Sequence, residues 1–270
     1  MIFANHAHTF PKEIRENGTV EALKRYMDQC GIDKCVAYST FIKILRENGV
    51  EYNPNRRLYE EIKSFPDIVG FGTVDATADN IEDQIDEIAS FNFRGIKVHP
   101  QAQQLPLDSK KAFRIYKKCE ELGLFISFHS GIHWYRLKDN HVSLFDEVAF
   151  NFPNLRFSME HIGGYSYFND ALAVMVNNKK HGLQPRVYAG WTSIAGTRSA
   201  WSINDEQLYA LLEQTTENNS IFGLDFPYNN RENTCKAIER IRGLDIPKST
   251  KEKILGLNFM QALGMVEPAI

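Results

Sequence analysis

The stretch Ile2-Phe3-Ala4-Asn5-His6-Ala7-His8 places two histidines at the end of a short apolar run. The run predicts a β-strand, and in a strand residues i and i+2 point to the same face. His6 and His8 would therefore present their imidazoles side by side where the strand ends. Such a pair supplies half of a metal site, and the alternative is a pair of solvated surface histidines.

Four later apolar runs also end in a residue that can bind a metal or carry a proton. They are Gly95-Ile96-Lys97-Val98-His99, Leu124-Phe125-Ile126-Ser127-Phe128-His129, Leu155-Arg156-Phe157-Ser158-Met159-Glu160-His161 and Ile221-Phe222-Gly223-Leu224-Asp225. Their last residues are separated by 30, 32 and 64 residues, and His8 lies 91 residues before His99. One strand, one helix and two loops take roughly 30 residues, so the polar residues fall at the ends of strands 1, 4, 5, 6 and 8 of a series of eight.

A series of eight such units predicts an α/β fold, the (β/α)8 TIM barrel. In this barrel the C-terminal ends of all strands open on one face, which holds the active site. The remaining strands are expected at 34–39, 68–74 and 186–191. Helices are expected at 80–89 and 109–122, and a final helix near 250–263 is expected to close the outer ring.

Length and composition agree with this fold and exclude several classes of protein. The chain has 270 residues, and we expect a single (β/α)8 barrel domain over 1–270. A net charge of −3 gives no basic footprint for nucleic acid or an anionic membrane, and no apolar run is long enough to span a bilayer. The four cysteines lack Cys-x-x-Cys spacing, so we expect reduced thiols in a cytoplasmic protein.

Several short motifs, taken together, resemble one family of metal-dependent barrels. The motifs are Asn5-His6-Ala7-His8, Gly95-Ile96-Lys97-Val98-His99-Pro100, Phe128-His129-Ser130-Gly131, Glu160-His161-Ile162-Gly163-Gly164, Gly223-Leu224-Asp225-Phe226-Pro227-Tyr228 and Lys253-Ile254-Leu255-Gly256-Leu257-Asn258. In this order they make the chain, from Ile2 to Gly264, resemble the amidohydrolase superfamily. The resemblance is to the amidohydrolase-2 branch, which includes aminocarboxymuconate-semialdehyde decarboxylase, benzoate-type decarboxylases and lactone or ring-cleavage hydrolases.

The resemblance implies a divalent metal site with His6, His8, His129 and Asp225 as ligands. Imidazoles and a carboxylate suit Zn²⁺ and neighbouring first-row ions, and Zn²⁺ is the expected metal. One ion is expected, and two ions are the alternative. The expected catalytic residues are His161, which would orient water or polarise the substrate, and Asp225, which would also act as general base and acid.

Two positions depart from the family pattern. Asn5 stands where the family usually has aspartate, at a position that generally points away from the cavity, and Leu224 stands where serine is common. Some relatives carry a carboxylated lysine on strand 4 that bridges two metals, and Lys97 would hold that position. His99 is expected to line the substrate pocket, with a second metal or hydrogen bonding behind the ligands as alternatives.

The loops after the strands are expected to select the substrate. Trp134 and Arg136 follow the strand that ends at His129, and Arg198 lies in the loop after the strand near 186–191. An aromatic side chain beside a guanidinium offers a stacking wall and a carboxylate clamp. We therefore expect a small carboxylate-bearing substrate. The alternative is solvated arginines and a tryptophan that only packs on the barrel rim.

Four functions compete. The first is hydrolysis of an amide, lactone or related carbonyl compound by metal-activated water, and the second is non-oxidative decarboxylation of a small unsaturated or aromatic carboxylate at the same site. The third is a metal-dependent nuclease or phosphoesterase, but those relatives place a glutamate near the end of strand 4, where this chain has Lys97 and His99. The fourth is a catalytically silent binding barrel. We expect the hydrolase, with homodimer formation implied by the family alone; His133, His141 and His181 are assigned no chemistry.

Overall fold

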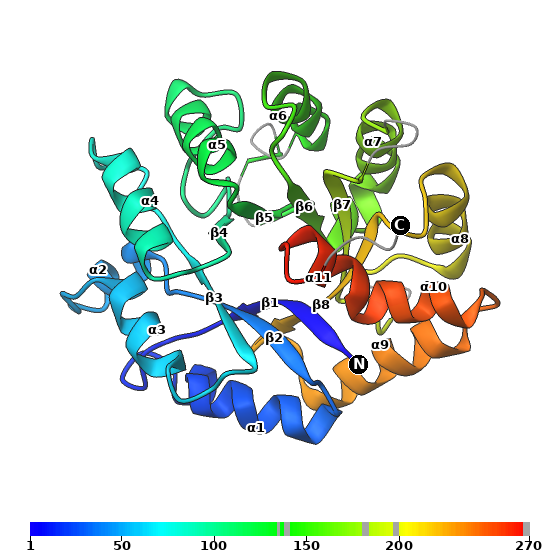
Figure 1. The fold of residues 1–270 in the computed structure, drawn as a ribbon, viewed down its shortest axis with the longest axis horizontal. Coiled ribbons are helices and arrows are strands. Elements are labelled where there is room, and N and C mark those ends of the chain that lie inside the picture. The colour runs from blue at the N-terminus through cyan, green and yellow to red at the C-terminus, as the bar shows by residue number, and fades with distance from the viewer. Residues whose placement is uncertain (134–135, 138–140, 180–183, 197–199, 267–270) are drawn as a thin grey trace.

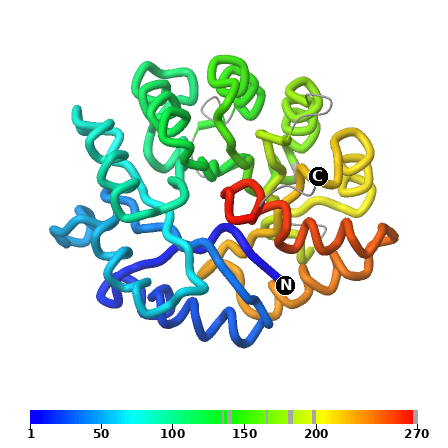
Figure 2. Tube along the Cα trace, viewed as in Figure 1, coloured from blue at the N-terminus to red at the C-terminus, as the bar shows by residue number. Residues whose placement is uncertain are grey.

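The computed structural model describes residues 1–133, 136–137, 141–179, 184–196 and 200–266. Eight parallel strands pair in the order β1 to β8, and β8 pairs with β1, which closes the barrel. Figure 1 shows helices wrapped around this barrel, and the tube in Figure 2 follows the same closed ring. The predicted (β/α)8 TIM barrel is therefore confirmed.

Helices separate the consecutive strands. The strands are β1 (Phe3–His8), β2 (Lys34–Tyr38), β3 (Ile68–Gly72), β4 (Gly95–Val98), β5 (Phe125–His129), β6 (Phe157–Glu160), β7 (Val187–Thr192) and β8 (Ser220–Phe226). The helices are α1 (Val20–Cys30), α2 (Ile42–Glu47), α3 (Pro54–Ile62), α4 (Ile81–Ser90), α5 (Lys110–Leu122), α6 (Phe145–Asn151), α7 (Gly164–Asn177), α8 (Asp205–Gln214), α9 (Arg231–Gly243), α10 (Lys248–Glu252) and α11 (Asn258–Ala262). In the described part of the chain, no helix is both long and apolar enough to cross a membrane.

Two residues of the sequence, Ser109 and Gly123, determine where helix α5 begins and ends. The Ser109 hydroxyl accepts a hydrogen bond from the backbone N–H of Ala112 at 3.2 Å, which caps the first turn. Gly123 ends the helix with a φ of 67°, a left-handed conformation that glycine adopts without steric strain. The helix predicted over 109–122 is confirmed, as is the helix predicted over 80–89, which is α4.

Side chains inside the barrel form three layers. The floor is apolar and contains Phe3, Val36, Phe71, Phe125, Tyr188 and Ile221. Above it lies a buried polar layer that contains Asn5, Tyr38, Lys97, Ser127 and Glu160. The histidines form the top layer, at the C-terminal ends of the strands. The polar layer therefore lies directly between the packed floor and the residues that carry chemistry.

The C-terminal helix α11 closes the floor of the barrel. The ring centroid of Phe259 lies 5.0 Å from that of Phe3, 6.4 Å from Phe71 and 5.6 Å from Phe125. Figure 1 shows α11, in red, over the centre of the ring of helices. The prediction that the helix near 250–263 joins the outer ring is wrong for α11. A π-helical turn at Lys253–Leu257 shifts the helical phase, so that Phe259 packs on the floor and Leu257 is exposed.

We predict that Phe259→Ala destabilises the protein by about 3–5 kcal/mol, because it removes a fully buried ring and leaves a cavity under the barrel. The matched control is Phe150→Ala, since Phe150 is 78% exposed and its loss should change stability by less than about 0.5 kcal/mol. Urea unfolding followed by circular dichroism measures both. Equal unfolding midpoints for the two variants would contradict the role assigned to α11.

Candidate active site

A cavity of about 300 Å³ opens at the C-terminal ends of the strands. Six residues singled out in the sequence line it, namely His6, His8, His99, His129, His161 and Asp225. The other lining residues are Thr9, Phe10, Ser39, Thr40, Phe41, Ile44, Ala102, His133, Trp201 and Tyr228. The polar residues that recur at strand ends along the sequence therefore meet in one cavity of the folded barrel.

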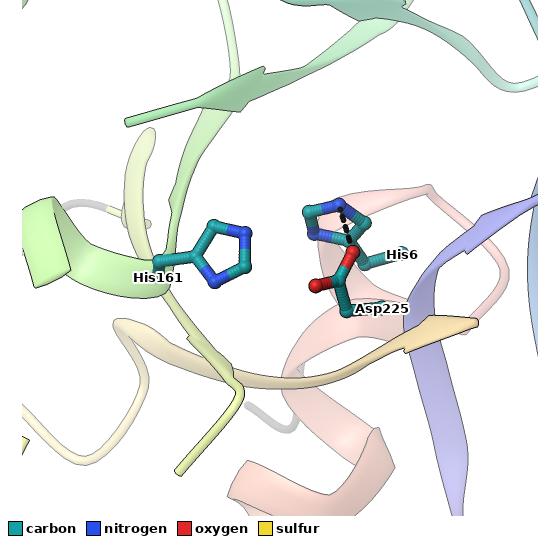
Figure 3. Close-up of side chains that lie close together, drawn as sticks. All are labelled: His6, His161 and Asp225. Atoms are coloured by element: carbon teal, nitrogen blue, oxygen red, sulfur yellow. Dashed lines mark ion pairs between the residues drawn. The ribbon is translucent and has the colours of Figure 1, made fainter. Parts of the chain in front are cut away.

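Three of these side chains form the centre of the cluster. Among the described residues, one group of three brings its ligand atoms within 4.8 Å of one another, and it consists of His6, His161 and Asp225. Figure 3 shows the three side chains facing one another, and Nε2 of His6 lies 3.4 Å from Oδ1 of Asp225. A larger cavity of about 580 Å³, lined by residues such as Arg156 and Arg186, holds no such group in the part of the chain that is described.

All three central residues have a left-handed backbone conformation. The φ angle is 67° at His6, 64° at His161 and 60° at Asp225. Residues other than glycine seldom adopt such angles, and each instance costs about 1–3 kcal/mol. Such strain persists where the surrounding structure enforces it, and it concentrates at functional sites. The backbone is therefore bent at the three positions whose side chains converge.

The strain at His6 belongs to a bulge in β1. The pairing of β1 with β2 shifts register between Ala4 and Ala7. As a result Asn5 and His6 both point into the barrel, where simple alternation would place only one of them. Asn5 does not line the cavity, in agreement with the expectation from the family that residue 5 points away from it. Asn5 is fully buried below the cavity, and Tyr38 donates a hydrogen bond to its Oδ1 at 2.8 Å.

A buried carboxylate below the cavity holds His6 in place. Glu160, the last residue of β6, is fully buried, and its Oε2 lies 3.1 Å from Nδ1 of His6. A carboxylate can only accept here, so we assign the imidazole proton to Nδ1. This tautomer leaves the lone pair on Nε2, which faces the cavity. Glu160 therefore fixes both the orientation of His6 and the atom through which it can bind a ligand.

Glu160 accepts four hydrogen bonds. Besides His6, the donors are Nδ2 of Asn5 at 2.7 Å, the Ser158 hydroxyl at 2.5 Å and the Thr192 hydroxyl at 2.7 Å. Four donors match the four lone-pair directions of a carboxylate. Gly190 makes room for the group, because a Cβ there would lie 2.5 Å from Oε2 of Glu160. The sequence around Glu160 is thus arranged to keep this carboxylate inside the barrel.

Burial keeps the histidines of the cavity neutral. It is the largest cause that lowers the pKa of His6, His8 and His129 well below the usual value, and the positive charge of Lys97 lowers these pKa values further. The same two causes lower the pKa of His161 to about 3. In contrast, burial raises the pKa of Asp225 to about 6. At neutral pH the site therefore presents uncharged imidazoles with available lone pairs beside one carboxylate.

Lys97 lies beneath these groups and is fully buried. Its Nζ has no hydrogen-bond partner among the described residues and lies 5.1 Å from the centroid of the Tyr38 ring. Burial lowers the pKa of Lys97 to about 8, against the opposing charges of Glu160 and Asp225. Lys97 points into the barrel, as alternation along strand 4 predicts, and whether it carries a carboxylate stays an open alternative.

The other predicted residues surround the central group. Nε2 of His8 lies 3.2 Å from Nε2 of His6, so the two imidazoles adjoin as predicted from their spacing. The ring of His129 lies 5.1 Å from that of His161 and stacks on His99, with centroids 4.0 Å apart. Nδ1 of His99 accepts a hydrogen bond from the backbone N–H of Ala102 at 3.3 Å, so its proton lies on Nε2. His99 is therefore suited to donate a hydrogen bond, which favours pocket lining over metal binding.

The residues present fit a divalent cation. Nε2 of His6 carries a lone pair, yet it faces an acceptor oxygen of Asp225 at 3.4 Å. Two electron-rich atoms this close repel unless a cation or a proton lies between them. In addition, Nε2 of His129 and Nδ1 of His161 are buried without a hydrogen-bond partner in the described part of the chain. Imidazole nitrogens and a carboxylate oxygen are the donors that divalent first-row metals bind.

The predicted substrate clamp receives no support from the described residues. Trp134 and Arg198 lie outside the part of the chain that the structure describes. Arg136 is described, is exposed and does not belong to the residues that line the cavity. The roles of Trp134, Arg136 and Arg198 in substrate binding therefore stay predictions.

Sequence reasoning missed three residues of the site. Glu160 was visible beside His161, but nothing in a single sequence marks a glutamate within a strand as facing inward. His133 was assigned no chemistry, yet it lines the cavity with its ring centroid 4.5 Å from that of His99. Trp201 also lines the cavity, with its ring centroid 5.4 Å from that of His161. It lies in a long loop, where no periodic pattern of residues indicates which side chains face inward.

Several solved structures have the same barrel fold as this protein. A 2,6-dihydroxybenzoate decarboxylase from Rhizobium has a TM-score of 0.69, with 15% identity and 98% of each chain covered. A protein from Pseudomonas putida described as a candidate 2-pyrone-4,6-dicarboxylic acid hydrolase has a TM-score of 0.71, with 14% identity and coverage of 99% of this chain and 98% of that chain. A dihydroxybenzoic acid decarboxylase from Polaromonas sp. JS666, with bound manganese and the inhibitor 2-nitroresorcinol, has a TM-score of 0.70, with 14% identity and the same coverage. At these identities the likeness shows the fold.

Comparison of the sequence identifies the family. A search of curated proteins finds no match. A family model described as amidohydrolase matches residues 41–263, which is most of the chain. The protein therefore belongs to the amidohydrolase family.

Proposed function

We propose that this protein is a metal-dependent hydrolase that acts on a small carbonyl compound such as an amide or a lactone. The observation that carries the proposal is the convergence of His6, His8, His129, His161 and Asp225 on one cavity at the C-terminal face of the barrel. His6, His8, His129 and Asp225 would hold one divalent cation, with Zn²⁺ as the proposed metal and Mn²⁺ as the alternative suggested by the Polaromonas structure. When bound, the cation would supply Lewis acidity that polarises a carbonyl group and acidifies a water molecule.

Asp225 is suited to move the proton in this reaction. Its carboxylate belongs to the central group with His6 and His161, where it can reach a water molecule or a substrate atom in the cavity. The Ser193 hydroxyl donates a hydrogen bond to its Oδ2 at 3.4 Å and limits the motion of the carboxylate. Asp225 would accept a proton from the attacking water and return it to the departing nitrogen or oxygen. Asp225 would thus serve as base and then as acid within one turnover.

His161 and His99 are suited to bind the substrate oxygen. Nδ1 of His161 is buried without a partner among the described residues, and it belongs to the central group of three. We assign to His161 the orientation of the water or of the carbonyl oxygen. His99, whose proton lies on Nε2, would donate a hydrogen bond to the substrate from the opposite wall. Phe41 and Ile44 supply an apolar wall that excludes water from the remaining volume.

Non-oxidative decarboxylation is the second candidate. It is supported by the structural likeness to 2,6-dihydroxybenzoate decarboxylase, since the same side chains could protonate a carbon atom after loss of CO₂. In that reaction Asp225 would deliver its proton to carbon, and His161 would hold the substrate carboxylate or hydroxyl. Both reactions need a substrate small enough for a cavity of about 300 Å³. They differ in the product.

We predict that the purified protein carries about one divalent ion per chain, and that the double variant His6→Ala, His8→Ala loses it. Inductively coupled plasma mass spectrometry measures the stoichiometry, and circular dichroism checks that the variant folds. The matched control is His141→Ala, because His141 is exposed and lies outside the cavity. Full metal retention by the folded double variant would refute the ligand assignment.

We predict that Glu160→Gln weakens metal binding by about 10- to 100-fold, because a carboxamide turns an NH₂ donor toward groups that already donate. His6 would then favour the tautomer with its proton on Nε2, and the ligating lone pair would be lost. Calorimetric titration with Zn²⁺ measures the affinity, and nitrogen chemical shifts of the imidazoles report the tautomer. Glu213→Gln, on the exposed face of α8, is the control. An unchanged affinity and tautomer in Glu160→Gln would count against this role.

The reaction class is tested with a panel of lactones, amides and dihydroxybenzoates. We predict consumption of a lactone or an amide with appearance of one new carboxylate and no release of CO₂. Liquid chromatography with mass detection follows the organic product, and a coupled assay follows CO₂. Stoichiometric CO₂ release from a benzoate, without turnover of lactones or amides, would establish the second candidate and overturn the first.

A further inference from the structure

A second cavity lies beside the candidate active site. It has a volume of about 290 Å³, and residues of α2 and of the segments that follow β3 and β4 line it. Ile42, Ala76, Thr77 and Gln104 are among these residues. The segments that follow the strands of a (β/α)8 barrel carry its functional residues. This second cavity, the side chamber, therefore lies on the same face of the barrel as the candidate active site.

A wall of single residues separates the side chamber from the candidate active site. Phe41, Ile44 and Ala102 line both cavities. The ring centroid of Phe41 lies 6.3 Å from that of His8 and 6.4 Å from that of His99. The wall thus adjoins a proposed metal ligand and a residue proposed to bind the substrate. A molecule held over these residues has only this wall to pass before it reaches the side chamber.

Helix α2 supplies part of this wall and is an addition to the repeating unit of the barrel. Two helices, α2 and α3, connect β2 to β3, whereas α4 alone connects β3 to β4. Leu45 of α2 is fully buried, but Ile42 and Ile44 are only partly buried. Ile42 lines the side chamber, and Ile44 lines both cavities. A ligand that covers the exposed parts of these isoleucines with apolar atoms gains binding free energy.

The charged residues of the side chamber pair with one another. Nη2 of Arg46 lies 2.7 Å from Oδ2 of Asp75, and the backbone N–H and hydroxyl of Thr77 both donate to Oδ1 of this aspartate. Nζ of Lys43 lies 3.9 Å from Oε1 of Glu47. In the described part of the chain, these two cations and two carboxylates are the charged residues of the lining. Neither sign of charge is in excess, so the side chamber favours an uncharged group over a charged one.

We propose that the substrate has two parts, a carbonyl group that reacts over His6, His161 and Asp225 and an uncharged, mostly apolar arm. The arm passes Phe41 and Ile44 and occupies the side chamber. The inference rests on the proposed function and deepens it, because it names the substrate class as carbonyl compounds with such an arm. An apolar cavity of about 150 Å³ in another protein accommodates benzene. A chamber of about 290 Å³ therefore has room for an arm of about six carbon atoms.

The test compares two probes that share a carbonyl headgroup and differ in the length of the arm. Acetohydroxamic acid and octanohydroxamic acid are titrated calorimetrically into the protein as purified and into the same protein after treatment with a chelator. Ile42→Trp and Gln104→Trp fill the side chamber from two different segments, and neither residue lines the candidate active site. The controls are Ile42→Val and Val176→Trp, the latter at an exposed position on α7. Zn²⁺ content and unfolding temperature are measured for each variant.

We expect the wild type to bind the octanoyl probe about 100-fold more tightly than the acetyl probe, because the longer arm buries six more methylene groups. Each filling variant should reduce this ratio at least about tenfold, change binding of the acetyl probe less than about twofold and leave Zn²⁺ content unchanged. Both controls should keep the ratio of the wild type.

Two results would overturn the assignment of the side chamber. One is a wild type that binds both probes equally, and the other is a folded filling variant that keeps the ratio or weakens both probes alike. A protein that carries no metal and hydrolyses no lactone or amide, yet loses its preference for the octanoyl probe in Ile42→Trp, would refute the proposed function and support the side chamber. Hydrolysis without any dependence on arm length would do the reverse.

Discussion

The carboxylate of Glu160 is the constraint around which the upper half of the barrel is organised. It lies inside the barrel with no exposed surface, where an unpaired charge would be severely destabilising. Four donors from β1, β6 and β7 converge on it. One of those donors is Nδ1 of His6, so the same interaction that satisfies the buried charge sets the tautomer of the first proposed ligand. Stability of the interior and chemistry of the cavity are thereby linked through a single side chain.

The packed apolar floor and the residues with strained backbone angles lie at opposite ends of the barrel. The floor is a packed aromatic layer sealed by Phe259 of α11. At the other end His6, His161 and Asp225 all have left-handed backbone angles, each of which costs about 1–3 kcal/mol. The packed floor and the closed hydrogen-bonded barrel can sustain that cost because the strained residues lie within, or directly after, strands that pair with a neighbouring strand on each side. The convergence of the site is therefore a property of the whole barrel and does not depend on a flexible loop.

The sequence was most informative where its signal was periodic. Strand-end residues recur at multiples of about one βα unit, so the barrel and the convergence of His6, His129, His161 and Asp225 could be predicted. Departures from regular geometry could not be. The bulge that turns Asn5 inward and the π-helical turn that brings Phe259 to the floor each shift the phase of a periodic pattern by one residue. His133 and Trp201 line the cavity from loops, whose paths are set by tertiary contacts.

The most direct test of the central claim is anomalous X-ray diffraction from crystals of the protein grown with Zn²⁺, recorded on both sides of the zinc absorption edge. The account predicts one anomalous peak in the cavity, about 2.0–2.2 Å from Nε2 of His6 and from a carboxylate oxygen of Asp225, with further imidazole nitrogens completing the coordination. A peak bound elsewhere, or a cavity with His6 and Asp225 well ordered and no anomalous signal between them, would contradict it.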